Sequence, residues 1–326
     1  MLKAGRMVGP RLYSTGSILY GADGDFKVVI NSVDDALSHL KRLKAVGAFS
    51  VKSYNQPRRD QRQQILEAAR QLKMEVVPEG GSTFFTNMNM VADGHTGIEH
   101  SIPVAPVYKD VTAFWGNTAV AYTPTLIVSY GSQWGENYWY DRTNVWENER
   151  LMAFTPRAII DARARRRTTS EYGDYGHIEV AKATKQIADA GVKVNLGAHG
   201  QIQGLGAHWE LWMLVQGGMS PLQAIRSGTL NGAAYLGMDK EIGSLEPGKL
   251  ADLVIMDANP LNDIRNSEKI KYVMINGRIF DSLSMNEIGT REKLRGKFWF
   301  ETGKGMIYSF PTGVAETYTY TIPNCD

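Results

Sequence analysis

The chain has 326 residues, with 36 Lys and Arg against 34 Asp and Glu, so its formal net charge at pH 7 is +2. This balance argues against a protein that binds nucleic acid or an anionic membrane, because such partners usually require a strong, clustered excess of basic side chains. Cys325 is the single cysteine, which excludes an intrachain disulfide and a cysteine-based metal cluster. The length suits either one large α/β barrel or two modest domains.

Residues 1–20 contain neither an apolar run that could span a membrane nor the apolar core of a signal peptide. From residue 26 to 214, short apolar runs alternate with amphipathic segments. Apolar residues recur every three or four positions in three segments, which predicts helices at 34–46, 58–72 and 178–190. Short strands are predicted at 28–30, 48–52, 74–77, 97–99, 119–122 and 192–196.

Strands that alternate with helices indicate parallel strands joined by helical crossovers, and hence an α/β fold. The pattern alone leaves open whether the parallel sheet closes into a barrel. After residue 243 the pattern changes to strands at 251–256 and 271–275, followed by a tight hairpin through Asn276-Gly277 into 278–280. Residues 297–300 and 316–321 also alternate as strands do. We therefore expect an α/β part at 1–240 and a small β subdomain with a C-terminal tail at 241–326.

Several polar side chains lie at the ends of the predicted strands. His95 and His100 flank the strand at 97–99, and His199 follows the strand at 192–196. Because the carboxyl ends of parallel strands share one edge, His100 and His199 are expected to converge, and neutral imidazole is the commonest metal ligand. The alternative is that each histidine only forms hydrogen bonds with the backbone at a strand end.

Two further candidates follow other strands. Lys52 ends the strand at 48–52, and a lysine that faces a barrel mouth changes its protonation readily, although a lone lysine is usually solvated. Glu79 precedes Gly80 and Gly81, and paired glycines let a ligand approach the backbone closely. The segment 197–206 is also rich in glycine, which suggests a phosphate-binding loop as a further hypothesis. It lacks the third glycine of the dinucleotide fingerprint, and the chain has no P-loop, so nucleotide binding is disfavoured.

The long connection between residue 126 and the helix near residue 178 is rich in aromatic side chains. They are Tyr130, Trp134, Tyr138, Trp139, Tyr140 and Trp146. Two interpretations stay open: the aromatic residues form a lid or binding loop, or they pack the connection onto the α/β part. Arg163 and the arginines at 165–167 are interpreted as the solvated C-terminal end of a helix.

Residues 243–255, with 259–261 and 273–278, resemble the metal-dependent amidohydrolase superfamily, closest to its imidazolonepropionase- and prolidase-like members. In that family such segments leave a TIM-like (β/α) barrel and build a small β-sandwich. Residues 9–11 are similar to the start of the third barrel strand, and the resemblance runs from about residue 5 to about residue 285. Residues 93–100 resemble the subgroup that follows a Tol-type β-propeller in exported bacterial proteins, which suggests a periplasmic or secreted location.

The resemblance implies roles for individual residues. Lys52 matches the fourth-strand lysine that bridges two divalent ions when carbamylated, and His100 matches the sixth-strand histidine ligand. The fifth-strand histidine is replaced by Glu79, and the eighth-strand aspartate is replaced by His199. Both replacements can still bind a metal ion, but the aspartate is the usual general base. His199 or His95 is therefore the candidate proton shuttle.

The chain contains no His-x-His pair, which the family carries on its first strand. If residues 9–11 approach the third strand, the first two strands are missing and the barrel is incomplete. The chain is then expected to be the C-terminal part of a longer protein. Its exposed sheet edge must be covered by the N-terminal residues, by the tail or by a partner chain, for example in a homo-oligomer.

The resemblance implies hydrolysis of carbon–nitrogen bonds other than ordinary peptide bonds in small cyclic or linear amides. One or two divalent ions, with zinc expected, would be held by Lys52, Glu79, His100 and His199. Because two ligands are missing, the isolated chain is expected to bind metal weakly and turn over poorly. The alternative is a catalytically degenerate scaffold that binds a partner or a glycan through the aromatic connection.

Overall fold

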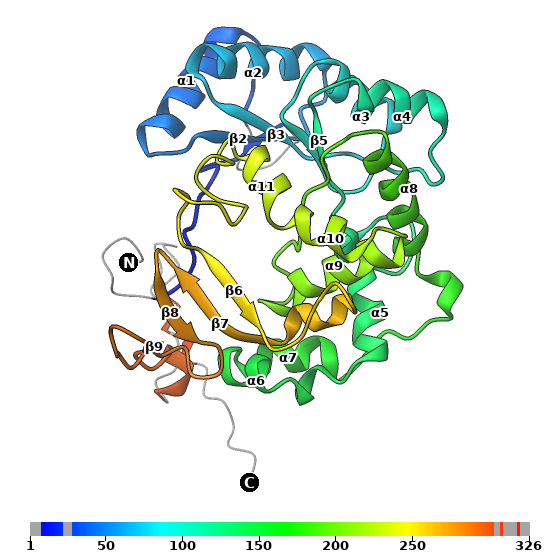
Figure 1. Cartoon of the computed structure of the whole chain (residues 1–326). Coiled ribbons are helices and arrows are strands. Elements are labelled where there is room, and N and C mark those ends of the chain that lie inside the picture. The colour runs from blue at the N-terminus through cyan, green and yellow to red at the C-terminus, as the bar shows by residue number, and fades with distance from the viewer. Residues whose placement is uncertain (1–7, 22–27, 303–306, 309–317, 320–326) are drawn as a thin grey trace.

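A computed structural model describes residues 8–21, 28–302, 307–308 and 318–319 (Figure 1). Its centre is a parallel sheet built in chain order. The strands are β1 (Leu19–Tyr20), β2 (Ser50–Tyr54), β3 (Glu75–Pro78), β4 (Gly97–Glu99) and β5 (Ala121–Thr123). Parallel bridges join Glu79 to Glu99 and Tyr122 to Val194, so the sheet continues from β3 to β4 and from β5 to a sixth segment. The predicted α/β fold with parallel strands is confirmed.

Helices cover the outside of this sheet as an arc (Figure 1). They are α1 (Val33–Ala45), α2 (Arg59–Leu72), α3 (Phe84–Ala92), α4 (Lys109–Gly116) and α8 (His177–Asp189). The chain then adds α9 (Leu205–Gln216), α10 (Pro221–Ser227) and α11 (Leu230–Tyr235). Among the described residues, the helices are all too short or too polar to cross a membrane.

Two predicted strands are absent. Residues 28–30 form no strand, although the Val28 N–H donates to the carbonyl of Tyr20 at 2.7 Å. Residues 192–196 reduce to the single bridge at Val194. The cause is local: the Asn195 N–H still donates to Tyr122, but the Leu196 N–H donates to the carbonyl of Ser227, so the chain leaves the sheet.

The long connection is mostly helical rather than a loop. It contains η1 (Leu126–Val128), α5 (Gly135–Arg142), η2 (Val145–Glu147), α6 (Glu149–Phe154), α7 (Arg157–Ala164) and η3 (Tyr172–Asp174). Trp139 and Tyr140 are buried, and their rings contact those of Trp212 and Trp209 on α9. The packing interpretation therefore holds for these two side chains. Tyr130, Trp134 and Trp146 are 40 to 47% exposed.

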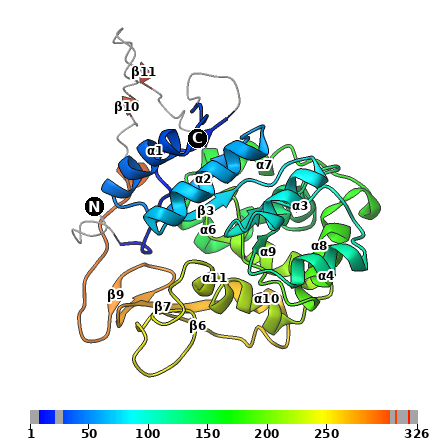
Figure 2. The same cartoon turned by 90° about the horizontal axis from the view of Figure 1, so that it is seen from above.

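The C-terminal part is an antiparallel sheet of four strands, as predicted for a separate β part. The strands are β6 (Leu253–Met256), β7 (Ile270–Ile275), β8 (Arg278–Asp281) and β9 (Glu287–Ile288), with η4 (Ile264–Glu268) before β7. Asn276 and Gly277 have φ angles of 49° and 75°, which confirms the tight hairpin. Figure 2 shows this sheet on a side of the molecule away from α1 and α2.

The predicted strand at 297–300 is wrong, because Trp299–Glu301 forms the 3-10 turn η5. Of residues 316–321, only 318 and 319 lie among the described residues. They form β11 (Tyr318–Thr319), which pairs with β10 (Ile307–Tyr308) in a two-stranded sheet of its own. The division of the chain at residue 240 stays a prediction. Side chains cross it, since the Trp212 Nε1 donates to the carbonyl of Ile264 at 3.1 Å.

Candidate active site

Four residues predicted from the sequence lie together at the carboxyl ends of the parallel strands. Lys52 is on β2, Glu79 and His100 directly follow β3 and β4, and His199 lies in the turn after Val194. Lys52 Nζ is 2.7 Å from Glu79 Oε2, and His100 Nε2 is 3.7 Å from Glu79 Oε1. The rings of His100 and His199 are 5.0 Å apart, edge to face. The expected convergence of strand ends is therefore present in the structure.

The backbone brings these side chains together by turning sharply at the strand ends. His100 and His199 have φ angles of 69° and 52°, in the left-handed region that few side chains adopt. Gly80 is needed for a different reason: a Cβ there would lie 2.7 Å from the carbonyl oxygen of Glu99. Its N–H donates to that same carbonyl at 2.6 Å. This glycine therefore serves the close pairing of two strand ends.

The electrostatics of the cluster keep His100 uncharged. Burial lowers the pKa of His100; Glu79 raises that pKa, and His199 and Lys52 lower it again. The Nδ1 atom of His100 is buried and has no hydrogen-bond partner. A neutral imidazole keeps a lone pair for accepting a proton or binding a metal ion.

Tyrosine rings surround the Lys52–Glu79 ion pair. Tyr20 and Tyr54 stack with their centroids 4.9 Å apart, and Tyr130 stacks on His100 at 5.8 Å. Burial raises the pKa of both Tyr54 and Tyr130, and the nearby charge of Glu79 raises it further. These two phenols therefore stay protonated at neutral pH and present hydroxyl groups and apolar ring faces to the cluster.

A hydrogen-bonded chain that the sequence did not indicate continues from His199. His199 Nδ1 lies 3.0 Å from Gln201 Oε1, and Gln201 Nε2 donates to Glu136 Oε1 at 2.9 Å. Arg163 Nη1 donates to Glu136 Oε2 at 2.9 Å. Arg163 does lie in the last turn of α7, as interpreted, but its guanidinium pairs with the buried carboxylate of Glu136. The sequence pattern does not indicate the pairing of Glu136 with Arg163, because Glu136 lies on α5 and Arg163 on α7, two separate short helices.

His95 lies apart from the cluster. It precedes β4, at the end of the strand opposite to His100, and it is 2% exposed. Its Nδ1 is 3.0 Å from the carbonyl oxygen of Met90, and burial lowers its pKa to about 4. The contacts of His95 are thus those of a core residue, and its role as a proton shuttle stays a prediction.

The cluster contains side chains of the kinds that bind a divalent metal ion. One carboxylate and two imidazoles are donors of the right chemistry. Among the described residues, however, no group of three or more His, Cys, Asp or Glu side chains is arranged to hold an ion. The ammonium group of Lys52 occupies one oxygen of Glu79. The donor set fits a divalent ion in kind but not in its present geometry.

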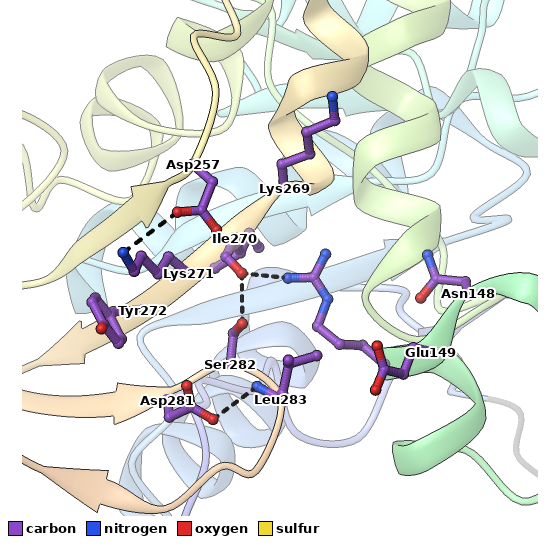
Figure 3. A pocket seen from close by; sticks show the side chains of 11 residues that line it. Asn148, Glu149, Asp257, Lys269, Ile270, Lys271, Tyr272, Asp281, Ser282 and Leu283 are labelled. Atoms are coloured by element: carbon purple, nitrogen blue, oxygen red, sulfur yellow. Dashed lines mark hydrogen bonds and ion pairs between the residues drawn. The ribbon is translucent and has the colours of Figure 1, made fainter.

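A cavity of about 550 Å³ lies elsewhere, between the start of α6 and strands β7 and β8 (Figure 3). None of the four strand-end residues lines it. Its polar groups pair with one another: Lys271 Nζ is 3.7 Å from Asp257 Oδ1, and the Ser282 hydroxyl donates to the carbonyl of Ile270. Volume alone therefore does not mark the reactive site in this molecule.

Polar side chains at the carboxyl ends of parallel strands, with helices outside, are the arrangement of the (β/α)-barrel class of proteins. The family described as "Amidohydrolase family" matches residues 59–280, which is more than half of the chain. The chain belongs to the amidohydrolase family. The resemblance stated from the sequence is confirmed, and the expected enzyme class, a hydrolase acting on carbon–nitrogen bonds, is the class of this family.

Curated relatives match only in part. A 5-methylthioadenosine/S-adenosylhomocysteine deaminase of Moorella thermoacetica is 41% identical over 69 residues, 18% of this chain and 16% of the relative. An imidazolonepropionase of Symbiobacterium thermophilum is 54% identical over 39 residues, 12% and 9% of the two chains. Guanine deaminase of Escherichia coli is 31% identical over 111 residues, which are 32% of this chain and 25% of the relative. The matches span at most a quarter of these three relatives.

Solved structures share the fold over most of the chain. A Xaa-Pro dipeptidase has a TM-score of 0.63 and 20% identity, with 86% of this chain and 70% of that chain covered. A bottromycin amidohydrolase has a TM-score of 0.64 and 16% identity, with coverage of 86% and 67%. These likenesses confirm the predicted TIM-like barrel fold. The association with a β-propeller stays a prediction.

Proposed function

We propose that this chain belongs to a hydrolase of carbon–nitrogen bonds other than ordinary peptide bonds, which acts on small cyclic or linear amides. The observation that carries the proposal is the meeting of Lys52, Glu79, His100 and His199 at the strand ends. Membership of the amidohydrolase family supports it. So do the tyrosines beside the cluster, because their ring faces suit a small planar group.

Each residue of the cluster has a proposed role. His199, whose side chain is exposed, moves the proton that the usual aspartate would take. Glu79 and His100 would hold a divalent ion, with zinc expected, and Lys52 would join them as a carbamate. His199 would complete this set only where it does not carry the proton, because its one unprotonated nitrogen serves one role at a time. When bound, such an ion polarises the substrate carbonyl and lowers the pKa of a bound water. His100 contributes as a neutral imidazole, in agreement with its lowered pKa.

Carbamylation of Lys52 is the change that would open the cluster to a cation. It replaces an ammonium group by an anion, so the attraction of Lys52 to Glu79, now 2.7 Å away, becomes repulsion. Two adjacent anions then favour a divalent cation between them. We therefore expect the chain to bind zinc weakly in buffer free of carbon dioxide and more tightly when bicarbonate is present.

The test is isothermal titration of the chain with zinc, with and without bicarbonate, together with turnover of a panel of cyclic and linear amides. Lys52→Met, which cannot form a carbamate, is expected to abolish the bicarbonate effect. Lys41→Met, at an exposed position on α1, is the matched control and should leave it unchanged. Tight stoichiometric zinc in both buffers, with amide turnover, would refute the expected weak binding.

A second candidate is a catalytically degenerate scaffold. It is favoured by the Lys52–Glu79 ion pair and by the lack of a metal-binding group of three among the described residues. In this case the exposed rings of Tyr130, Trp134 and Trp146 bind a protein partner or a glycan. Anomalous scattering at the zinc edge separates the two candidates. A peak between His100 and His199 supports the hydrolase, and its absence from zinc-soaked crystals supports the scaffold.

A further inference from the structure

We propose that Glu136 and Gln201 are positioning residues that fix the tautomer of His199. They hold a proton on Nδ1 and leave Nε2 as the acceptor of the ring. This inference rests on the proposed function for the use that is made of His199. The tautomer itself follows from hydrogen-bond geometry alone.

The first step concerns the direction of the Gln201 amide. Glu136 is 3% exposed, and its two oxygens contact Gln201 Nε2 and Arg163 Nη1, each at 2.9 Å. An ionised carboxylate only accepts hydrogen bonds. The amide nitrogen of Gln201 must therefore face Glu136, since its oxygen would meet another acceptor there.

The second step transfers this direction to His199. With its nitrogen on Glu136, Gln201 presents Oε1 to His199 Nδ1 at 3.0 Å. A carbonyl oxygen only accepts, so Nδ1 must donate and carry the ring proton. A neutral imidazole has a single ring proton, which leaves Nε2 unprotonated. A bond to the other ring nitrogen thus decides which atom is available for chemistry.

Arg163 anchors the series of hydrogen bonds that runs from His199 through Gln201 to Glu136. Arg163 Nη1 also donates to the backbone carbonyl of Gln201 at 3.0 Å, so one guanidinium holds both members. Burial holds the pKa of Glu136 above its usual value, and the hydrogen bond from Gln201 and the charge of Arg163 offset only part of this rise. Arg163 thereby favours the ionised, accepting form. His199 and Gly200 have φ angles of 52° and 70°, and this left-handed turn brings the side chains at 199 and 201 together.

The test reads the tautomer of His199 directly by long-range ¹H–¹⁵N NMR of the full chain at pH 8, where ordinary imidazoles are neutral. His199→Asn identifies its signals. One net hydrogen bond of about 1 kcal/mol raises the ratio of the Nδ1–H form to the Nε2–H form about fivefold over that of a ring without this bond. Glu136→Gln can donate as well as accept, so the Gln201 amide is free to turn. We expect the ratio in this variant to fall about fivefold below that of the wild type.

Two further variants keep the outcome clear. Gln201→Met removes the link between His199 and Glu136 and keeps the Glu136 carboxylate in place. It should also release the tautomer of His199, so the proposal stays testable if Glu136→Gln fails to fold. Glu147→Gln, at an exposed glutamate that accepts from Asn144, should change nothing. An Nε2–H form in the wild type, or an unchanged ratio in both chain variants, overturns the proposal.

This readout requires neither turnover nor metal. A wild type with the Nδ1–H form and no amide hydrolysis keeps the positioning role and rejects the proposed function. Amide hydrolysis together with an Nε2–H form does the opposite. The two failures are therefore distinguishable in a single set of samples.

Discussion

Replacing Glu210 by Gln is expected to destabilise the protein at low pH and to do so less as pH rises. Glu210 lies on α9 and is fully buried, and its two oxygens accept from the backbone N–H groups of Leu126 and Ile127 at 2.8 and 3.0 Å. Those groups belong to η1, the turn that leads from β5 to Tyr130 beside His100. The side chain thus fastens α9 to a turn that forms part of the candidate site.

The magnitude follows from the hydrogen bonds and the ionisation of Glu210. Gln offers one acceptor where Glu offers two, so one buried N–H loses its partner at a cost of about 1 to 3 kcal/mol. Burial raises the pKa of Glu210 from 4.5 to about 8, although the two N–H groups act in the opposite direction. Between these values the folded state keeps a proton that the unfolded state releases.

The stability of the wild type therefore falls through that window by up to about 1.4 kcal/mol per pH unit, while a Gln at this position carries no such dependence. From pH 5 to pH 8 we expect the difference between the two proteins to shrink by up to about 4 kcal/mol, and the Gln variant to be at least as stable as the wild type by about pH 8.

Urea unfolding followed by tryptophan fluorescence at pH 5, 6, 7 and 8 measures this difference. Glu147→Gln is the control, and its effect should stay within about 0.5 kcal/mol at every pH because the side chain is exposed. A destabilisation by Glu210→Gln that is the same at all four pH values would refute the raised pKa. A gain of stability at pH 5 would refute the role of the two backbone hydrogen bonds.

Two other substitutions test the packing that supports the site. Gly217→Ala would place a Cβ 2.3 Å from a backbone carbon of α8, so we expect a loss of about 1 to 3 kcal/mol in thermal unfolding. Gly173→Ala, which meets nothing within 4 Å, should lose far less. Trp212→Phe removes the bond to Ile264 that joins α9 to the C-terminal part and should cost about 1 to 2 kcal/mol in urea unfolding. Trp134→Phe, at a side chain that is 47% exposed, is its control.

Long helices were predictable from the sequence to within one or two residues. The segment predicted at 34–46 forms Val33–Ala45, because an apolar stripe and the Ser32 cap both define it. The segment predicted at 178–190 forms His177–Asp189, where the apolar stripe alone defines the helix because Gly176 provides no side-chain cap. The connection from 126 to 177 was not predictable, because its helices have only 6 to 8 residues and show too few turns to reveal a period.

The convergence of Lys52, Glu79, His100 and His199 was predictable, whereas the separate place of His95 and the pairings of the side chains were not. Parallel strands bring their carboxyl ends to one edge, so residues that follow successive strands are neighbours whatever lies between them in the sequence. Which neighbour a side chain contacts depends on backbone turns such as the left-handed conformations of His100 and His199, which no sequence pattern indicates. The Lys52–Glu79 ion pair and the hydrogen bonds that link Gln201, Glu136 and Arg163 are contacts of this kind and were not predictable.

The sign of one measurement separates two roles of Lys52, that of a carbamylated metal ligand and that of a cation that competes for Glu79. Lys52 is 31% and Glu79 12% exposed in their side chains, so their ion pair lies between the surface and buried cases and contributes about 1 to 3 kcal/mol. A cation that binds through Glu79 alone must displace Lys52, and Lys52→Met should then strengthen zinc binding by about 5- to 150-fold. If Lys52 binds as a carbamate, the same substitution removes a ligand and weakens zinc binding when bicarbonate is present. With bicarbonate present, a stronger affinity in Lys52→Met thus contradicts the carbamate, and a weaker one contradicts a role for Lys52 as a competing cation.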